Sequence, residues 1–212
     1  MMLVSFTYSD EEGFFLVRLA RRTVDGYVAE RRKPEVPEDT PSHLLEKSGV
    51  FVTLNTVRGQ RVDLRGCIGR PYPTNPLAEA TIDSSVDSAA NDPRFPPVSK
   101  SELDTIIIDL SVLTPPRRIE YNSPSELLEK VEVGRDGLIA VRGMWRGLLL
   151  PQVPVEWNWN TEEFLEHTCT KAGIPGHLWR DPKTEFMSFQ AEIFGETEPH
   201  GEIVRNPKHT KR

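Results

Sequence analysis

Two reactive side chains stand two residues apart in the hexapeptide Leu64-Arg65-Gly66-Cys67-Ile68-Gly69. If this segment is a strand, side chains alternate between its faces, so Arg65 and Cys67 project from the same face. Arginine is permanently charged, and a cation near a cysteine favours the thiolate over the thiol. Glycine weakens a strand unless the backbone is closely approached or bulges, which makes Gly66 and Gly69 informative. The pattern describes an anion pocket with Cys67 as the candidate nucleophile and with Arg65, Gly66 and Gly69 as candidate ligand-binding residues.

The alternative for Cys67 is a structural role, because cysteine is among the most buried residue types. Cys169 shares one face of an expected helix with Leu165 and Ala172, so we expect it in the core. His167 falls on the other side of that helix, as an exposed residue or a candidate ligand-binding residue at the edge of a cleft. A nucleophile–base pair of Cys67 and His167 would require the two side chains to meet across the fold.

A second candidate group is the segment Asn91-Asp92-Pro93-Arg94-Phe95, where two charged residues flank a proline. A rigid turn here could place the Asp92 carboxylate for acid–base work and the Arg94 guanidinium for a substrate carboxylate or phosphate. The alternative is an Asx turn made by Asp92 with Arg94 exposed to solvent. We keep both residues as candidate ligand-binding residues.

The remaining polar and aromatic residues give weaker signals. The histidines and cysteines form no closely spaced ligand pairs, so we expect no metal and no cofactor. Trp157 and Trp159 are two residues apart on an extended segment, where they could stack on a planar ligand or pack against neighbouring elements.

The composition favours an intracellular protein. The chain has 212 residues, a net charge of −6 and only two cysteines. The acidic balance argues against a general affinity for nucleic acid, although basic residues cluster at residues 18–33 and 205–212. Few cysteines, a short apolar N-terminus without basic residues and no long apolar run predict a cytoplasmic protein that neither carries a signal peptide nor spans a membrane.

The elements that must position these residues follow from periodicity, caps and breakers. Strands are expected at about residues 50–56, 62–70, 105–113, 137–142, 147–152 and 185–194, and helices at about residues 10–22, 77–90, 123–134 and 160–171. Hairpins interleaved with helices are typical of an α+β fold, with mostly antiparallel sheet and helices packed on its faces. Residues 196–212 carry few apolar side chains and are expected to form a mobile tail.

The hexapeptide resembles the signature of the family named after the AMME chromosomal region, the human deletion locus of Alport syndrome, midface hypoplasia and elliptocytosis. The sequence also resembles that family in four further blocks, at residues 91–95, 111–114, 147–153 and 164–169. The resemblance implies one α+β domain over residues 9–195, with a larger lobe and a smaller lobe around residues 49–100. It also implies that the hexapeptide faces the cleft between the lobes.

Three hypotheses for the function follow. The first is a small-molecule enzyme or binder with its site in the cleft, where Arg65 anchors an anionic group and Cys67 reacts or lines the pocket. The second is a non-catalytic partner or scaffold module, because prokaryotic members of the family often accompany a Memo-like protein and a radical S-adenosylmethionine protein. The third, a nucleic-acid-linked role as suggested for human relatives, is disfavoured by the acidic balance. The sequence leaves the oligomeric state open.

Overall fold

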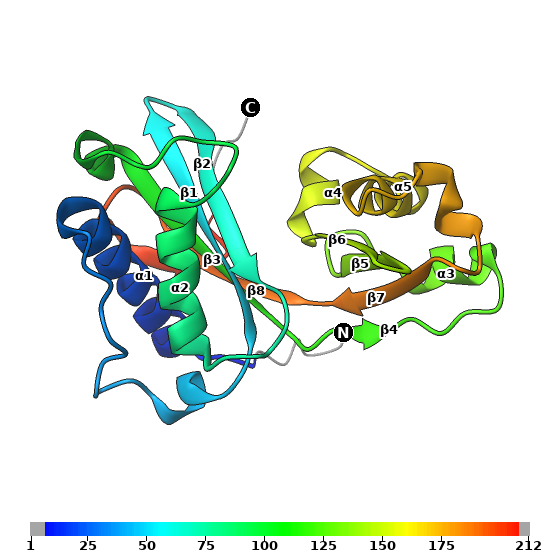
Figure 1. Ribbon diagram of the computed structural model, residues 1–212, viewed down its shortest axis with the longest axis horizontal. Coiled ribbons are helices and arrows are strands. Elements are labelled where there is room, and N and C mark those ends of the chain that lie inside the picture. Colours follow the sequence, from blue (N-terminus) through cyan, green and yellow to red (C-terminus); the bar gives the residue numbers. More distant parts are fainter. Residues whose placement is uncertain (1–6, 208–212) are drawn as a thin grey trace. The chain divides into compact units, whose positions relative to one another are not determined.

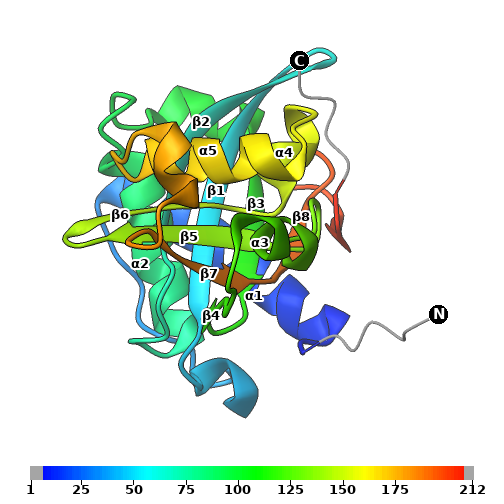
Figure 2. The same ribbon diagram turned by 90° about the vertical axis from the view of Figure 1, so that its right-hand side faces the viewer.

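The computed structural model describes residues 7–207, which form two compact units. The first unit contains the chain up to Leu113 together with the chain from Glu192 onward, and the second unit contains Thr114–Ala191. Each unit has its own sheet, its own helices and its own hydrophobic core (Figures 1 and 2). The structure confirms the α+β class with antiparallel sheets and packed helices, whereas the cleft between two lobes stays a prediction.

The first unit is built on a five-stranded sheet with the strand order β2-β1-β3-β8-β9. Its strands are β1 (Gly49–Arg58), β2 (Arg61–Arg70), β3 (Ile106–Leu113), β8 (Ala191–Glu196) and β9 (Ile203–Arg205). Strand β1 pairs antiparallel with both β2 and β3, and β8 pairs antiparallel with β9. Strand β2 is therefore an edge strand, and the hexapeptide lies near its C-terminal end.

Two long helices, α1 (Asp10–Glu30) and α2 (Leu77–Ala90), lie on the same face of this sheet (Figure 1). Helix α1 begins at a capping box formed by Ser9 and Glu12, as its sequence predicts. Its apolar stripe packs on the inward-facing residues of β1 and β3, and this core contains Leu16, Val17, Ala20, Val24, Val50, Val52, Leu54, Ile106, Ile108, Leu110 and Val112. Short 3₁₀ helices, η1 (Ser42–Leu45) and η2 (Lys100–Thr105), lie in the connections.

The second unit has a four-stranded sheet with the strand order β4-β7-β5-β6. Its elements are β4 (Arg117–Arg118), α3 (Pro124–Lys130), β5 (Gly137–Arg142), β6 (Trp145–Leu149), α4 (Gln152–Glu156), α5 (Thr161–Lys171), the 3₁₀ helix η3 (Gly176–Arg180) and β7 (Glu185–Phe189). Figure 2 shows α4 and α5 on one side of this sheet. Close packing of α5 on β6 requires a glycine, because a Cβ atom on Gly147 would lie 2.4 Å from the nitrogen of Ala172.

The chain divides elsewhere than the sequence suggests. Residues 49–100, the expected smaller lobe, contain β1, β2 and α2 and belong to the first unit, because β1 is shared between β2 and β3 in one sheet. The expected strand at residues 185–194 is two strands, since β7 ends at Phe189 and β8 begins at Ala191. These strands belong to different sheets.

The C-terminal segment is also more ordered than its composition suggests. Strand β9 pairs with β8, and the Arg205 guanidinium binds the carboxylates of Asp10 and Glu192 and the carbonyl oxygen of Tyr8. These polar contacts, together with the packing of Ile203 on the hydrophobic core, hold residues 203–205 in place. Residues 208–212, also expected to be mobile, lie outside the described residues. No helix in the described part of the chain combines the length and apolar character that crossing a membrane requires.

Candidate functional site

Cys67 lies on the face of the first sheet that is opposite to α1 and α2. Gly66 faces α2, because a Cβ atom built on it would lie 2.1 Å from the carbonyl oxygen of Ser88. The next residue along the strand must therefore point away from the helices. Cys67 is paired with Thr53 on β1, and the Thr53 hydroxyl donates a hydrogen bond of 3.3 Å to the Cys67 sulfur.

A β-bulge at Arg65 interrupts the alternation on which the sequence argument depends. Leu54 pairs with Gly66, but the next residue of β1, Asn55, pairs with Leu64, so Arg65 is an additional residue on β2. The Arg65 guanidinium binds the carboxylate of Glu102 through two hydrogen bonds, of 2.6 and 3.3 Å. This contact holds the pKa of Glu102 at about 2, well below its usual range. The positive charge of Arg65 is therefore paired with Glu102 and not with Cys67.

The cation that the structure brings to Cys67 belongs to Arg94, in the loop that follows α2. The Arg94 Nη2 donates to the Cys67 carbonyl oxygen at 3.2 Å. The pKa of Arg94 is raised, and the largest cause is its side-chain hydrogen bonding to Asp92. The Cys67 side chain contributes a smaller part of the increase, through its charge and through a hydrogen bond. The Arg94 side chain is 47% exposed, so its guanidinium is accessible as well as anchored.

Asp92 holds this arrangement together. Its side chain is only 2% exposed, and its two oxygens accept hydrogen bonds of 2.9 and 2.7 Å from Arg94 and of 2.9 Å from the backbone nitrogen of Cys67. These contacts hold the pKa of Asp92 at about 2, and the hydrogen bonds from the Arg94 side chain make the largest contribution. The Arg94 backbone nitrogen also donates to the Asp92 side chain, at 3.1 Å, which is the Asx turn that the sequence suggests. An ionised, fully bonded carboxylate positions its neighbours and is poorly suited to proton transfer near neutral pH.

The two glycines of the hexapeptide are explained by packing. Gly66 allows the backbone of α2 to lie against β2, as its contact with Ser88 shows. A Cβ atom on Gly69 would lie 2.4 Å from ring carbons of Phe51 and from the carbonyl oxygen of Val50. A role for Gly66 and Gly69 in binding a ligand therefore stays a prediction, since close packing already accounts for both.

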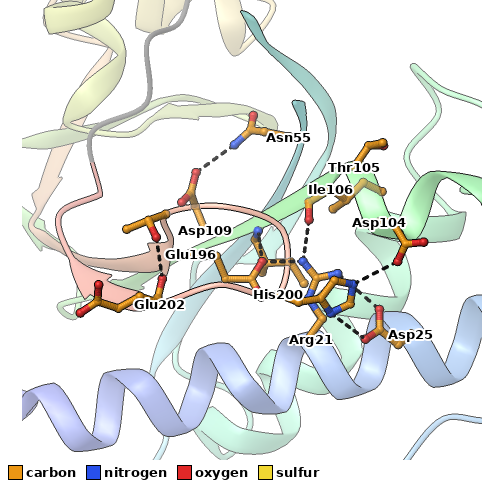
Figure 3. Close-up of polar contacts among 12 residues, drawn as sticks. Arg21, Asp25, Asn55, Asp104, Thr105, Ile106, Asp109, Glu196, His200 and Glu202 are labelled. Carbon is orange, nitrogen blue, oxygen red and sulfur yellow. Dashed lines mark hydrogen bonds and ion pairs between the residues drawn. The ribbon is translucent and has the colours of Figure 1, made fainter. Parts of the chain in front are cut away.

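The same face of the sheet carries polar residues that the sequence argument missed. Thr53 pairs with Cys67 on one side and with Asp109 of β3 on the other. The Asn55 side chain, which is buried, donates a hydrogen bond of 2.9 Å to Asp109 (Figure 3). The available signal was the alternation of the polar Thr53 and Asn55 with the apolar Val52 and Leu54 within a predicted strand.

His167 lies in the second unit, on α5, where it is exposed and stacks on Trp159 with ring centroids 3.8 Å apart. Its role as a ligand-binding residue stays a prediction. Cys169 is fully buried on the same helix, and burial raises the pKa of its thiol to about 12, as expected for a core residue. Among residues 7–207, no three histidine, cysteine, aspartate or glutamate side chains gather closely enough to hold a metal ion.

Comparison with known proteins places this geometry in a family. The chain is 53% identical over 203 residues to protein TK0174 of Thermococcus kodakarensis, covering 95% of this chain and 98% of that protein. It is 48% identical over 194 residues to protein MJ0810 of Methanocaldococcus jannaschii, covering 92% and 94%. The crystal structure of the uncharacterized protein PH0010 from Pyrococcus horikoshii matches with a TM-score of 0.91 at 54% identity, over 96% of this chain and all of that one. The AMMECR1 family model matches residues 17–194, and the chain therefore belongs to the AMMECR1 family.

Proposed function

We propose that this protein is a small-molecule enzyme or binder in which the Cys67 thiolate works beside the guanidinium of Arg94. The observation that carries the proposal is the way in which buried Asp92 binds both Arg94 and the backbone of Cys67. This contact fixes a half-exposed cation next to a half-buried cysteine. Because a cation and a hydroxyl donor both favour the thiolate, Arg94 and Thr53 prepare Cys67 as a nucleophile.

The division of roles differs from the one that the sequence suggests. Arg94 takes the part assigned to Arg65, because its half-exposed guanidinium keeps Nη1 outside the hydrogen bonds that Nε and Nη2 make with Asp92 and Cys67, and this nitrogen can donate to a carboxylate or phosphate oxygen. Arg65 joins β2 to the 3₁₀ helix η2 by binding Glu102. The site requires no metal for this chemistry, and its substrate is a small anionic molecule. We place this activity in the cytoplasm, where a cysteine remains reduced.

Alkylation with iodoacetamide tests the proposal, because the sulfur attacks the carbon and iodide leaves only when the thiol is deprotonated. We expect Cys67 to be alkylated with a pH midpoint below the value of about 8.5 for a free thiol, and the midpoint to rise in Arg94→Gln. The rate is followed by intact mass, and Cys67→Ala gives the background from the buried Cys169. Arg58→Gln, an exposed arginine at the β1–β2 turn, is the matched charge control.

Two results would count against the proposal. One is a midpoint for Cys67 at or above that of a free thiol. The other is an equal effect of Arg94→Gln and Arg58→Gln, which would mean that only the overall charge of the protein matters. Far-UV circular dichroism of each variant separates a changed thiol from a changed fold.

A partner or scaffold module is the second candidate, favoured by apolar side chains that the second unit exposes. Met144 is 92% and Trp145 57% exposed at the turn between β5 and β6, and Trp157 is 67% exposed after α4. Large exposed apolar side chains of this kind are typical of protein interfaces. Co-purification with a Memo-like or radical S-adenosylmethionine protein from the same genome tests this candidate. Binding that survives Met144→Ser and Trp145→Ser would count against this surface.

A further inference from the structure

A hollow of the first unit lies along α1, on residues that the Cys67 group does not use. It has a volume of about 830 Å³ and is lined by α1, by the segment after α1 and by the turn between β8 and β9. This volume lies within the range of pockets that hold small molecules. On α1 the lining residues include Phe14, Arg18, Arg22 and Asp25, which recur every three or four residues and therefore form one stripe of the helix.

The floor of this hollow is a buried ion pair. Arg21 donates to both oxygens of Glu196, at 2.9 and 2.5 Å, and to the carbonyl oxygen of Ile106 at 2.6 Å (Figure 3). Glu196 also accepts a hydrogen bond of 3.0 Å from the backbone nitrogen of Ile108. Because their hydrogen-bonding groups are occupied, Arg21 and Glu196 shape the hollow and are not the groups that would bind a ligand.

The rim carries arginines with no such partner. Arg18 and Arg22 are exposed, and neither has an ion pair or side-chain hydrogen bond within residues 7–207. They stand four residues apart on one helix, where like charges repel and destabilise the helix. Arg32, which makes a longer contact of 3.6 Å with Glu30, adds a third guanidinium to the lining. An anion bound between the guanidinium groups would remove this repulsion and so stabilise the helix.

The acidic residues of the lining do not cancel these charges. The Asp25 carboxylate binds Arg21 at 3.3 Å and lies 3.9 Å from the His200 ring, so these two residues share its charge (Figure 3). Glu202 is exposed on the rim. Four arginines against three carboxylates give the lining a formal charge of +1 on a chain of −6. Phe14 and Ile203, both half-buried, supply apolar surface beside the charged rim.

We propose that this hollow is a binding site for a small molecule with clustered negative charge, held by Arg18, Arg22 and Arg32. Phosphate and carboxylate groups share the geometry that a guanidinium recognises, and both fit this rim. The apolar surface of Phe14 accommodates a flat or apolar part of the same molecule. This site is separate from the Cys67 group and does not depend on its proposed function.

Isothermal titration calorimetry with three probes tests the inference and separates the sources of charge. Pyrophosphate supplies phosphate alone, citrate supplies carboxylates, and adenosine monophosphate adds a flat ring to a phosphate. We expect at least one probe to bind the wild type, and the double variant Arg18→Gln/Arg22→Gln to bind it ~10-fold or more weakly, because each charge-assisted hydrogen bond contributes appreciably. The double variant Arg58→Gln/Arg61→Gln removes the same charge at the β1–β2 turn and should bind as the wild type does.

Three outcomes overturn the inference. The first is that no probe binds the wild type at millimolar concentration. The second is that both double variants weaken binding equally, which would indicate attraction to the overall charge. The third is loss of binding in Cys67→Ala alone, which should otherwise bind the probe normally; that loss would assign the probe to the Cys67 group. Far-UV circular dichroism shows whether each variant is folded.

Discussion

The Asp92→Asn substitution tests the central claim that a buried carboxylate organises the Cys67 group. The substitution keeps the shape of the side chain and removes the charge that binds Arg94 and the backbone nitrogen of Cys67. The pKa of Asp92 is about 2 in the folded protein against a usual value of 3.8, mainly because of the Arg94 side chain. Since the side chain is almost fully buried, the difference corresponds to about 2 kcal/mol of folding stability at neutral pH.

The sign of the pH dependence follows from the lowered pKa. A carboxylate that is more acidic in the folded protein stabilises it at every pH above the unfolded value, and this stabilisation is lost as the pH falls toward the folded value. The asparagine variant cannot titrate at this position. We therefore expect the wild type to be more stable than Asp92→Asn by about 2 kcal/mol at pH 7 and by roughly half of that at pH 3.

Urea denaturation between pH 7 and pH 3, followed by far-UV circular dichroism, measures this difference. All four tryptophans lie in the second unit, so tryptophan fluorescence follows that unit separately. Asp39→Asn changes an exposed aspartate and should shift the stability by less than about 0.5 kcal/mol. Equal stability of wild type and Asp92→Asn at pH 7, or a difference that does not shrink by pH 3, would refute the reasoning.

Two further substitutions probe the packing around the sites. Gly66→Ala should destabilise the protein by about 1–3 kcal/mol or prevent folding, because the new methyl group would meet the Ser88 carbonyl oxygen at 2.1 Å; a thermal melt that matches the wild type would contradict this packing. Glu196→Gln should cost about 3–5 kcal/mol in urea denaturation, because it removes the buried counter-charge of Arg21 and leaves that residue only the longer contact with the partly exposed Asp25. Glu202→Gln, on the exposed rim of the same hollow, is the control, and an equal loss in both variants would show that the buried pair is not what matters.

The hairpin of β1 and β2 shows how far sequence reasoning reaches and where it fails. The sequence predicts strands at residues 50–56 and 62–70, and the register counted outward from the pair of Arg58 with Arg61 holds as far as the pair of Asn55 with Leu64. Continued without interruption, that register would place Thr53 opposite Gly66. The bulge shifts it by one residue, so that Thr53 meets Cys67 instead. Gly66 signals a bulge or a close approach of the backbone, but it does not tell which residue of β2 is the additional one.

Helix boundaries were predictable where caps mark them and less so elsewhere. The capping boxes at Ser9 and Asn160 start α1 and α5 as expected, because these signals are local. Helix α1 continues to Glu30, beyond the expected end near Arg22, since burial of Val24 and Val28 in the core supports its last turns. The boundary between the two units near residue 191 was not predictable, because the residue that ends β7, Phe189, lies in an unbroken apolar alternation.

The two sequence blocks that carry the family resemblance most clearly are parts of one structure. The hexapeptide supplies a cysteine and two glycines that packing requires, and the segment at residues 91–95 supplies the carboxylate and the cation that meet that cysteine. Neither block alone places a cation beside a cysteine: Arg65 of the hexapeptide is bound to Glu102, and the segment at residues 91–95 holds Arg94 through Asp92 but contains no cysteine. Any chemistry of the hexapeptide must therefore depend on the loop after α2. A variant of that loop that leaves β2 unchanged should alter the reactivity of Cys67 as strongly as a change within the hexapeptide itself.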